Sequence, residues 1–508
     1  MDKYLEGTPM VSSVSGRIMS DPKAVFTAFG AIIAVYFVTT CLYNLFLSPL
    51  RHLPGPWFAA ASPLPFVYAM IRGGWNTYLV DLHRQYGPVV RFGPDHISYA
   101  DAQAQRDVHA PAGLRHAFDK HPALYQAVTS NEQSIFTSNG NQHERHRRIL
   151  LRAFTDGAMQ RLTPMIKTYI DMLMDRLDEH AKAKNPANMQ DLLLFVTVDT
   201  ASDFLFGEPF NMTRDGKAHS FVAGVLNLTE IGQVVAGLQQ LRWFRFLWDN
   251  VVQYLIQPVL QKHQGVTNER VTRRLEKGVE AREDMIKYSR QGKETLNDQE
   301  LFLNASHLWL AASETSTTSL AALVFFLLQH PEAHARLVNE VRTAYATEAE
   351  LADTSRLPQL KWVDACIKEA QRLHSPLPTP LPRLIPKGGA TICGGFVPEG
   401  SCVVVPTCAA SQTAENFHDP HAFRPERWLD EDPDFANDKQ AAFQPFLLGP
   451  KSCIGKPMAL LQMRWIAATI FWKYDLDLLE ESKQWIDQKV FVLWEQKPLK
   501  VNLKERTT

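Results

Sequence analysis

The stretch FLLGPKSCIGKP, Phe446 to Pro457, places one cysteine between two glycines. Its Gly-Lys pair is also found in phosphate-binding loops, which need the pattern G-x-x-x-x-G-K-[ST]. Here five residues, not four, separate Gly449 from Gly455, and Pro457 stands where a magnesium-binding hydroxyl is required. The stretch therefore does not predict a nucleotide site, and Cys453 needs another explanation.

The composition narrows the possibilities. The chain has 508 residues, 45% of them apolar, so it can bury a large core. A formal net charge of -1 argues against nucleic acid as a partner, because nucleic-acid binding needs a concentrated basic surface. The cysteines form no C-x-x-C pair and no disulfide-dense spacing, which suits a reducing compartment and leaves metal binding or nucleophilic catalysis as functions for a cysteine. They are Cys41, Cys366, Cys393, Cys402, Cys408 and Cys453.

An uncharged segment near the N-terminus predicts a membrane anchor. Residues 24–47 contain no charged side chain and would be about 36 Å long as a helix, enough to cross a hydrocarbon core of about 30 Å. A secretory signal has a shorter apolar region. After it, Pro54 and Pro56 cannot continue a helix. We therefore expect an N-terminal tail (1–23), a transmembrane anchor (24–47), a proline-rich elbow (48–57) and one large domain (58–508).

The charges flanking the anchor favour one orientation. Arg17 and Lys23 precede the segment, and Arg51 alone follows closely. By the positive-inside rule this distribution would place the bulk of the chain outside the cytosol.

Helical periodicity dominates the large domain. Apolar residues recur at i, i+3 and i+4 spacing in residues 159–184, 302–329, 334–346, 362–373 and 458–474. Strand-like runs are few, chiefly residues 89–99 and 390–406, each bounded by Gly or Pro. The predicted fold class is mainly α with a minor β-sheet component.

One predicted helix carries a polar centre between apolar ends. Residues 308–328 read LWLAASETSTTSLAALVFFLL, and the polar centre would be costly in lipid. A helix through the middle of a globular core fits better, and Glu314 would then be an ionisable group in a low-dielectric place, where it must be paired or useful. Alternatively, the hydroxyls only bond back to i-4 carbonyls.

Two further motifs suggest an ion-pair network. Glu369 and Arg372 share a helix face, a spacing that is usual for exposed pairs of little energetic value. Arg427 follows in a proline-braced turn, and its planar fork of donors could bridge Glu369. The three residues would then tie a loop to a helix.

These motifs occur in an order that resembles the cytochrome P-450 superfamily of haem-thiolate monooxygenases. The resemblance rests on A-A-S-E-T (311–315), E-x-x-R (369–372), P-E-R-W (425–428) and F-x-x-G-x-x-x-C-x-G (446–455). It extends over essentially the whole chain, including the apolar N-terminal segment and the L-P-G-P elbow. It implies the cytochrome P-450 fold for the large domain.

For Cys453, the resemblance implies the role of proximal thiolate ligand to haem iron, and so the metal ligand of the chain. A predicted helix begins just after the loop, and its positive N-terminal end favours an anionic sulfur. Gly449 and Gly455 would allow a tight turn close to the porphyrin, and Phe446 would pack beside the sulfur. The alternative is a buried, unreactive cysteine, the common fate of a lone Cys.

The resemblance also implies catalytic and haem-binding roles for other residues. Glu314 and Thr315 match the pair that relays protons during O₂ activation, although Ala312 replaces the usual glycine and narrows the adjoining groove. Haem propionates need cationic partners, and the matching positions are Arg147, Arg383 and Lys451, where lysine replaces the usual arginine. His143 stands where the family has tryptophan.

The implied activity is that of a membrane-anchored monooxygenase that takes haem, O₂ and a lipophilic small molecule. The chain carries no flavin or nicotinamide fingerprint, so we expect electrons from an NADPH-dependent reductase. Its docking face would include Arg145, Arg147, Arg148, Arg152, Lys451 and Lys456. A haem-thiolate isomerase or dehydratase that needs no O₂, and a non-catalytic haem-binding module, remain as alternatives.

For substrate and location, the sequence is most similar to fungal tailoring enzymes of secondary metabolism, which act on terpenoids, polyketides or alkaloids. Residues 238–255 resemble the mobile lid of the family. Pocket candidates are residues 124–137, Trp309, Ser313, residues 377–381 including Leu377, and residues 490–494. The anchor resembles the single-pass endoplasmic-reticulum type, which implies a cytosolic catalytic domain, contrary to the charge rule.

Overall fold

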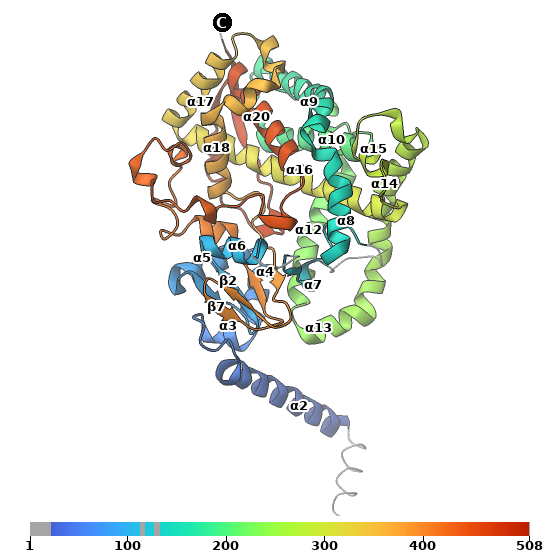
Figure 1. Cartoon of the computed structure of the whole chain (residues 1–508), viewed down its shortest axis with the longest axis vertical. Coiled ribbons are helices and arrows are strands. Elements are labelled where there is room, and N and C mark those ends of the chain that lie inside the picture. The colour runs from blue at the N-terminus through green and yellow to red at the C-terminus, as the bar shows by residue number, and fades with distance from the viewer. Residues whose placement is uncertain (1–21, 112–116, 126–132, 507–508) are drawn as a thin grey trace, which may run out of the picture.

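The computed structural model describes residues 22–111, 117–125 and 133–506. Within these residues a large helical body carries four small sheets, as the sequence predicts for the fold class (Figure 1). The helices are α2 (Pro22–Leu42), α3 (Trp57–Ala61), α4 (Leu64–Ile71), α5 (Trp75–Tyr86), α6 (Ala102–His109), α7 (Pro122–Tyr125), α8 (Gly140–Leu150), α9 (Asp156–Ala183), α10 (Met189–Phe206), α11 (Met212–Asp215), α12 (Ser220–Leu238), α13 (Arg242–Leu247), α14 (Gln253–Glu276), α15 (Met285–Arg290), α16 (Asp298–Gln329), α17 (Pro331–Ala344), α18 (Lys361–Leu373), α19 (Thr407–Ser411) and α20 (Lys456–Lys473).

The strands are short and mostly lie near the N-terminal end of the body. They are β1 (Val89–Arg91), β2 (His96–Tyr99), β3 (Asp119–Lys120), β4 (Ala187–Asn188), β5 (Arg383–Leu384), β6 (Ala390–Ile392), β7 (Gly395–Val397), β8 (Cys402–Val404), β9 (Tyr474–Leu478), β10 (Val490–Phe491), β11 (Leu493–Trp494) and β12 (Lys500–Glu505). The largest sheet has the order β1-β2-β8-β5-β3, with β2 and β8 parallel. Each of the two segments predicted as a strand contains more than one strand. A bend at Gly93-Pro94 divides the first, and a turn at Cys393-Gly394 divides the second.

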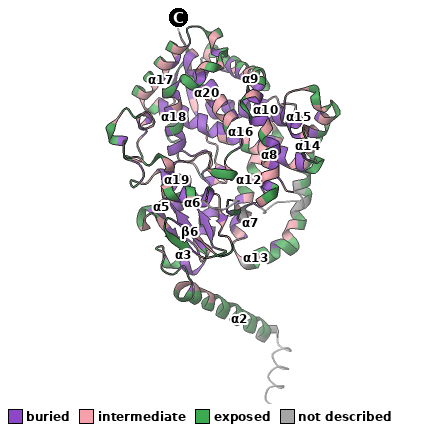
Figure 2. Cartoon of the chain, viewed as in Figure 1, coloured by how far each residue is buried: buried purple, intermediate pink, exposed green. Residues whose placement is uncertain are grey.

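The N-terminal helix projects away from the body. Helix α2 continues into a π-helical turn, Tyr43–Leu47, and its apolar side chains are exposed, Phe26 to 77% and Leu47 to 68% (Figure 2). Val25–Leu47 is long and apolar enough to cross a membrane. An apolar helix thus occupies the segment for which the sequence predicts an anchor.

Helix α16 crosses the centre of the body. It begins with a capping box, in which the Asn297 side chain accepts from the Glu300 backbone and the Glu300 side chain accepts from that of Asn297. Its apolar window is 72% buried, so the segment is a core helix, although its length and hydropathy alone would allow a membrane span. Helix α10 packs along it, and the hydroxyls of Thr197 and Thr317 bond across the contact at 2.7 Å.

Helix α10 is a helix that periodicity did not find. Almost every residue from Met189 to Phe206 is buried, so the helix has no polar stripe from which a period could be read. Some of its buried hydroxyl groups are satisfied within the helix. Thr200 and Ser202, for example, donate to the carbonyls four residues back.

A fully buried carboxylate joins α18 to the chain segment before the Cys453 loop. Arg372 donates to Glu369 through Nε and Nη2, each at 2.8 Å, and Arg427 Nε donates to the same carboxylate at 3.0 Å. Trp428 Nε1 donates to it as well, at 3.0 Å. All three charged side chains are 0% exposed. The structure therefore brings together the Glu369, Arg372 and Arg427 side chains that the sequence analysis grouped.

Removing this carboxylate is expected to destabilise the fold. Glu369→Ala leaves the buried Arg372 guanidinium without its counter-charge and leaves Arg427 with Asp438 alone. We expect the free energy of unfolding to fall by about 3–5 kcal/mol. The measurement is a guanidinium unfolding curve followed by tryptophan fluorescence. The matched control is Glu431→Ala, which removes the exposed partner of Arg336 and is expected to cost less than about 1 kcal/mol. Equal effects of the two substitutions would contradict the role of the buried network.

Candidate functional site

Cys453 lies in a tight loop directly before α20. The loop, residues 446–455, is closed by a hydrogen bond from the Cys453 N–H to the Phe446 carbonyl at 2.7 Å. Gly449 has φ +69°, and a Cβ there would lie 2.3 Å from the carbonyl oxygen of His109. Only glycine fits this position without a shift of the backbone, so the loop geometry depends on Gly449.

The Cys453 thiol faces an internal cavity and lies at the N-terminus of α20. Burial raises the pKa of the thiol above its usual value. Backbone N–H groups of Gly455 and Lys456 and the charge of Arg147 act in the opposite direction, because they stabilise the thiolate. These groups favour the thiolate form of Cys453, which can bind a metal cation.

This central cavity lies between the Cys453 loop and α16. Helix α16 presents one face to it, which includes Leu308, Ala311, Ala312, Thr315 and Ser316. These positions follow the i, i+3, i+4 spacing of a single helix face. The other walls include Tyr125, Ile135, Phe136, Phe154, Ala201, Phe204, Leu205, Leu377, Leu381, Phe446, Met458 and Met463. The cavity is thus mainly apolar, and Cys453 is the one thiol among the described residues of its wall.

Four basic side chains also line the cavity, and we call them the cation cluster: Lys120, Arg147, Arg383 and Lys451. Their contacts are mostly with neutral oxygens. Arg147 donates to the Ser452 carbonyl at 2.6 Å, Arg383 to the Tyr125 hydroxyl at 2.7 Å, and Lys451 to the Phe118 carbonyl at 2.6 Å. The nearest carboxylate oxygen to Lys451 Nζ, on Asp119, lies 3.8 Å away. The cluster therefore carries an excess of positive charge.

The electrostatics of the cluster point to an anionic ligand. Burial and the neighbouring charge of Arg383 lower the pKa of Lys120 to about 6 and that of Lys451 to about 8. Arg383 Nε is buried with no hydrogen-bond partner among the described residues. Carboxylates of a ligand entering here would offset the charge of the cluster, and one of them would satisfy this donor. The donor set thus fits an apolar ligand that carries acidic substituents and a centre that binds a thiolate.

Two residues of the cavity wall show what sequence reasoning covered and missed there. The sequence analysis did not predict Lys120 as a site residue. Its position becomes apparent only in the sheet, where Lys120 pairs with Arg383 across the β3–β5 ladder. His143, which the resemblance marks as a cofactor residue, does line the cavity. Burial, with the nearby charges of Lys120, Lys451 and Arg147, lowers its pKa to about 3, so its imidazole is neutral.

Glu314 and Thr315 point to different sides of α16. Thr315 lines the cavity and its hydroxyl donates to the Ala311 carbonyl at 2.7 Å. Glu314 is buried away from the lining residues, where its carboxyl accepts from the Thr318 hydroxyl at 3.3 Å and from the Gln496 side-chain amide. Burial raises the pKa of Glu314 to about 8. Gln496, a partner that no motif marks, lies far along the chain.

Trp309, Ser313 and the segment 490–494, all predicted pocket candidates, do not line the central cavity. Trp309 turns toward α10, where its Nε1 donates to Ser202 Oγ at 2.8 Å, and Ser313 Oγ donates to the Trp309 carbonyl at 2.7 Å. Both lie on the face of α16 away from the cavity, because the lining positions are 308, 311, 312 and 315. Leu377 does lie in the wall. Of the segment 124–137, Tyr125, Ile135 and Phe136 line the cavity, and residues 126–132 lie outside the described part of the chain.

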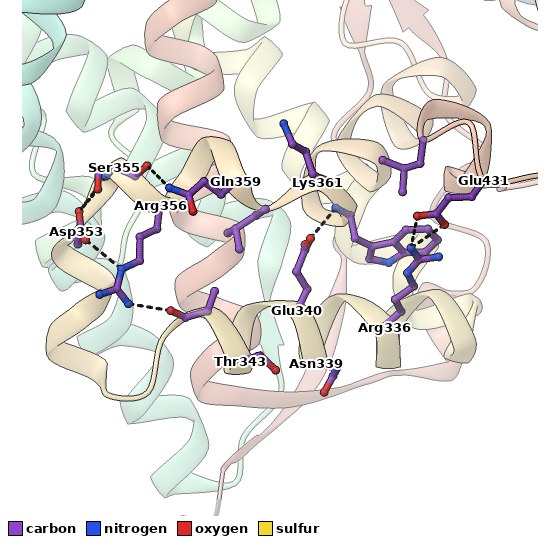
Figure 3. A pocket seen from close by; sticks show the side chains of 14 residues that line it. Arg336, Asn339, Glu340, Thr343, Asp353, Ser355, Arg356, Gln359, Lys361 and Glu431 are labelled. Carbon is purple, nitrogen blue, oxygen red and sulfur yellow. Dashed lines mark hydrogen bonds and ion pairs between the residues drawn. The ribbon is translucent and has the colours of Figure 1, made fainter.

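A larger groove on the surface is chemically less suitable. It encloses about 820 Å³, against about 280 Å³ for the central cavity, and lies between α17 and the residues leading into α18 (Figure 3). Its charged side chains pair with one another: Arg336 donates to Glu431 at 2.8 Å, and Arg356 to Asp353 at 3.1 Å. Because these charges already neutralise one another, only its larger volume supports the groove as the functional site. The Cys453 thiol and the cation cluster support the central cavity instead.

Comparison with known proteins identifies the family of the chain. The Cytochrome P450 family model matches residues 58–503. A cytochrome P450 monooxygenase of Stereocaulon alpinum is 36% identical over 477 residues, covering 92% of this chain and 93% of that protein. An averantin hydroxylase of Dothistroma septosporum is 33% identical over 504 residues (97% and 93%), and a trichothecene C-4 hydroxylase of Trichoderma arundinaceum is 34% identical over 481 residues (92% and 94%).

Gly449→Ala is expected to distort the Cys453 loop. The new Cβ would press on the His109 carbonyl and force alanine into a left-handed conformation, at a cost of about 2 kcal/mol or more. Unfolding curves should show this loss. The control is Gly265→Ala in α14, where a Cβ meets nothing within 4 Å and we expect no loss, or a gain of up to about 1 kcal/mol. A Gly449→Ala protein as stable as the parent would refute the steric requirement.

Glu314 should make stability depend on pH. Its pKa is about 8 in the folded protein and near 4.5 in the unfolded chain, so the folded state binds this proton more tightly. Its stabilising contribution is complete below pH 4.5 and is lost as the pH rises to about 8. Between pH 5 and pH 8 the parent protein should therefore lose more unfolding free energy than Glu314→Gln does. Parallel pH profiles of the two proteins would contradict the assignment.

Proposed function

Because the chain belongs to the cytochrome P450 family, a family of haem-thiolate enzymes, we propose that this membrane-anchored monooxygenase binds haem in the central cavity through the Cys453 thiolate. The cation cluster would hold the haem propionates, with Arg147, Arg383 and Lys451 as the matching family positions and Lys120 as an addition. Gly449, Gly455 and Phe446 would shape the loop beneath the ring, and His143 would lie beside it. The observation that carries this proposal is the convergence of one thiol and four under-neutralised cations on one apolar cavity.

When bound, a thiolate-ligated haem supplies O₂ activation, because the sulfur pushes electron density toward the iron. The chain's own residues then bind the substrate, exclude water and deliver protons. Thr315 places its hydroxyl in the cavity wall, and its bond to the Ala311 carbonyl fixes its orientation. Glu314, neutral below about pH 8, holds a proton next in sequence to Thr315, and Gln496 fixes its carboxyl. We propose these residues as the proton-delivery group.

The substrate is proposed to be a lipophilic secondary metabolite of a fungus, of the terpenoid, polyketide or alkaloid class. The apolar wall formed by Phe204, Leu205, Leu308 and Leu377 supports a lipophilic ligand. His307 adds one polar group: its Nδ1 contacts Ser134 Oγ at 2.8 Å, which leaves Nε2 for a hydroxyl or carbonyl of the ligand. The names of the averantin and trichothecene hydroxylases support the fungal secondary-metabolite class.

We further propose an endoplasmic-reticulum location with a single span and a cytosolic catalytic domain. Besides α2, exposed apolar side chains gather on α3, α4 and the α13–α14 region: Trp57, Phe58, Leu64, Tyr68, Trp243, Phe246, Tyr254 and Leu255. The latter four belong to the segment 238–255 that resembles the family's lid. Their exposure supports a body that rests against lipid.

Electrons are proposed to come from an NADPH-dependent reductase. The basic face suggested for its docking is partly neutralised, since Arg145 pairs with Glu300 at 2.6 Å and Arg148 with Glu294 at 2.9 Å. Arg147 and Lys451 line the cavity. We therefore propose that the reductase contacts Arg152, Lys456 and the Cys453 loop.

The first experiment is the absorption spectrum of the reduced, carbon monoxide-treated protein. A strongly red-shifted Soret band in the parent protein, and its loss in Cys453→Ser, would support the proposed ligation. A band typical of histidine-ligated haem would overturn it. NADPH- and O₂-dependent turnover with a reductase then separates the monooxygenase from a haem-thiolate isomerase or a haem-binding module, because neither of these consumes O₂.

Thr315→Ala tests the proton-delivery role. Haem content should stay unchanged, while product per NADPH falls by about 10-fold or more and hydrogen peroxide rises in its place. The matched control is Thr168→Ala on the outside of α9, which removes the same kind of hydroxyl bond to an i-4 carbonyl. It should leave the ratio of product to peroxide as in the parent protein. Unchanged coupling in Thr315→Ala would exclude this role.

A further inference from the structure

A second group of thiol and imidazole side chains lies outside the central cavity. His96 in β2 and Cys402 in β8 are direct partners in the parallel ladder of the largest sheet. His121 follows β3, the last strand of the same sheet, and its backbone N–H donates to the Pro382 carbonyl at 3.1 Å. The potential ligand atoms of these three side chains all lie within 4.8 Å of one another. Three strands of one sheet therefore bring one thiol and two imidazoles together.

The surroundings of His96 are those of a metal ligand. Its Nδ1 is 2.6 Å from Asp95 Oδ1, so the carboxylate fixes the ring and leaves Nε2 as the nitrogen for a further contact. A carboxylate on the second ring nitrogen is the usual partner of a zinc-bound histidine. His96 and Cys402 are buried, and His121 is partly exposed.

A small cavity adjoins the three side chains. It has a volume of about 40 Å³, which is room for an ion and one water-sized ligand, and His96, His121, Cys402 and Thr379 line it. The Thr379 hydroxyl is buried and has no hydrogen-bond partner among the residues that the structure describes. A ligand on a bound ion would satisfy this group. The cavity thus offers both a donor set and an unsatisfied polar atom beside it.

We propose that His96, His121 and Cys402 form a zinc site separate from the haem cavity, with Asp95 as the outer partner of His96 and a fourth position open to a small ligand near Thr379. One thiolate and two imidazoles suit Zn²⁺, which takes mixed sulfur and nitrogen ligands in tetrahedral geometry. Tetrahedral bonds of about 2.0–2.3 Å require ligand atoms about 3.3–3.6 Å apart, so side-chain rotations of about 1 Å close the site. Binding releases the Cys402 thiol proton to solvent.

The site would join β2, β8 and the segment after β3. Strand β3 and the segment after it also contribute Lys120 and Tyr125 to the wall of the central cavity. The pocket is lined in addition by Ala236 and Gln240, at the end of α12. A bound ion would therefore hold the sheet, the α12 terminus and the cavity wall in one arrangement.

Zinc binding is measured on the full-length, haem-loaded protein after chelator treatment and dialysis. We expect one zinc per chain, and the zinc-edge X-ray absorption spectrum should show one sulfur at about 2.3 Å and nitrogen ligands at about 2.0–2.1 Å. Cys402→Ser and His121→Ala should each weaken zinc binding at least 100-fold. Asp95→Asn, which keeps all three ligands, should weaken it by about 10–100-fold.

Cys393→Ser is the matched control, because it removes an exposed thiol from the neighbouring β6–β7 hairpin and should leave zinc binding unchanged. Haem content and the carbon monoxide spectrum of each variant show whether it has folded. If Cys402→Ser loses haem, His121→Ala replaces it as the test variant, because His121 is partly exposed and its substitution disturbs the core less. A parent protein that binds no zinc at micromolar concentrations, or variants that bind it as the parent does, would overturn the proposal.

Discussion

The buried Glu369 carboxylate, shared between Arg372 and Arg427, holds the part of the chain that has the least secondary structure of its own. Beyond the carboxylate, Arg372 donates to the carbonyls of Ser411 and Pro420, at 2.7 and 2.6 Å. Arg427 donates to the His418 carbonyl at 3.1 Å and to Asp438. A guanidinium group has five donors in a fixed plane, so each arginine satisfies several loop carbonyls while the single acid neutralises part of the charge. The segment that leads to the Cys453 loop is therefore fixed from within.

The cavity joins two surfaces of opposite character. Helix α16 supplies a face of apolar side chains and hydroxyl groups, those of Thr315, Ser316 and Ser319. The side near β3, α8 and the Cys453 loop supplies the thiol and the basic side chains. Burial, and then the like charges of Arg383 and Lys451, lower the pKa of Lys120, because a low-dielectric interior disfavours an uncompensated charge. An enzyme that keeps such a cluster gains stability when an anionic group binds. The charge of Arg147, a member of the cluster, also acts to lower the pKa of the Cys453 thiol, against the larger effect of burial.

Motif spacing predicted the parts of the site that depend on local geometry, and it failed where geometry is set by distant segments. Cys453, Gly449 and Thr315 belong to short patterns with their own backbone requirements, and the helical class followed from periodicity. Trp309 and Ser313 do not line the central cavity. Buried residues occur along most of their helix, so its sequence does not indicate which face borders the cavity. The sequence analysis missed Lys120, His307 and Gln496 because each is placed in the site by a partner more than 150 residues away in the sequence. These partners are Arg383, Ser134 and Glu314. Helix α10 was missed for want of a polar stripe.

The largest sheet links the central cavity to the proposed zinc site, because side chains alternate between the two sides of its strands. Successive side chains of an extended segment point to opposite sides. Lys120 lines the central cavity and His121 lines the small one, and likewise Arg383 faces the first and Pro382 the second. A shift of this sheet edge would move both sets of residues together. An ion bound in the small cavity would therefore help to position Lys120 and Arg383 of the cation cluster. It would do so without contacting a ligand in the central cavity.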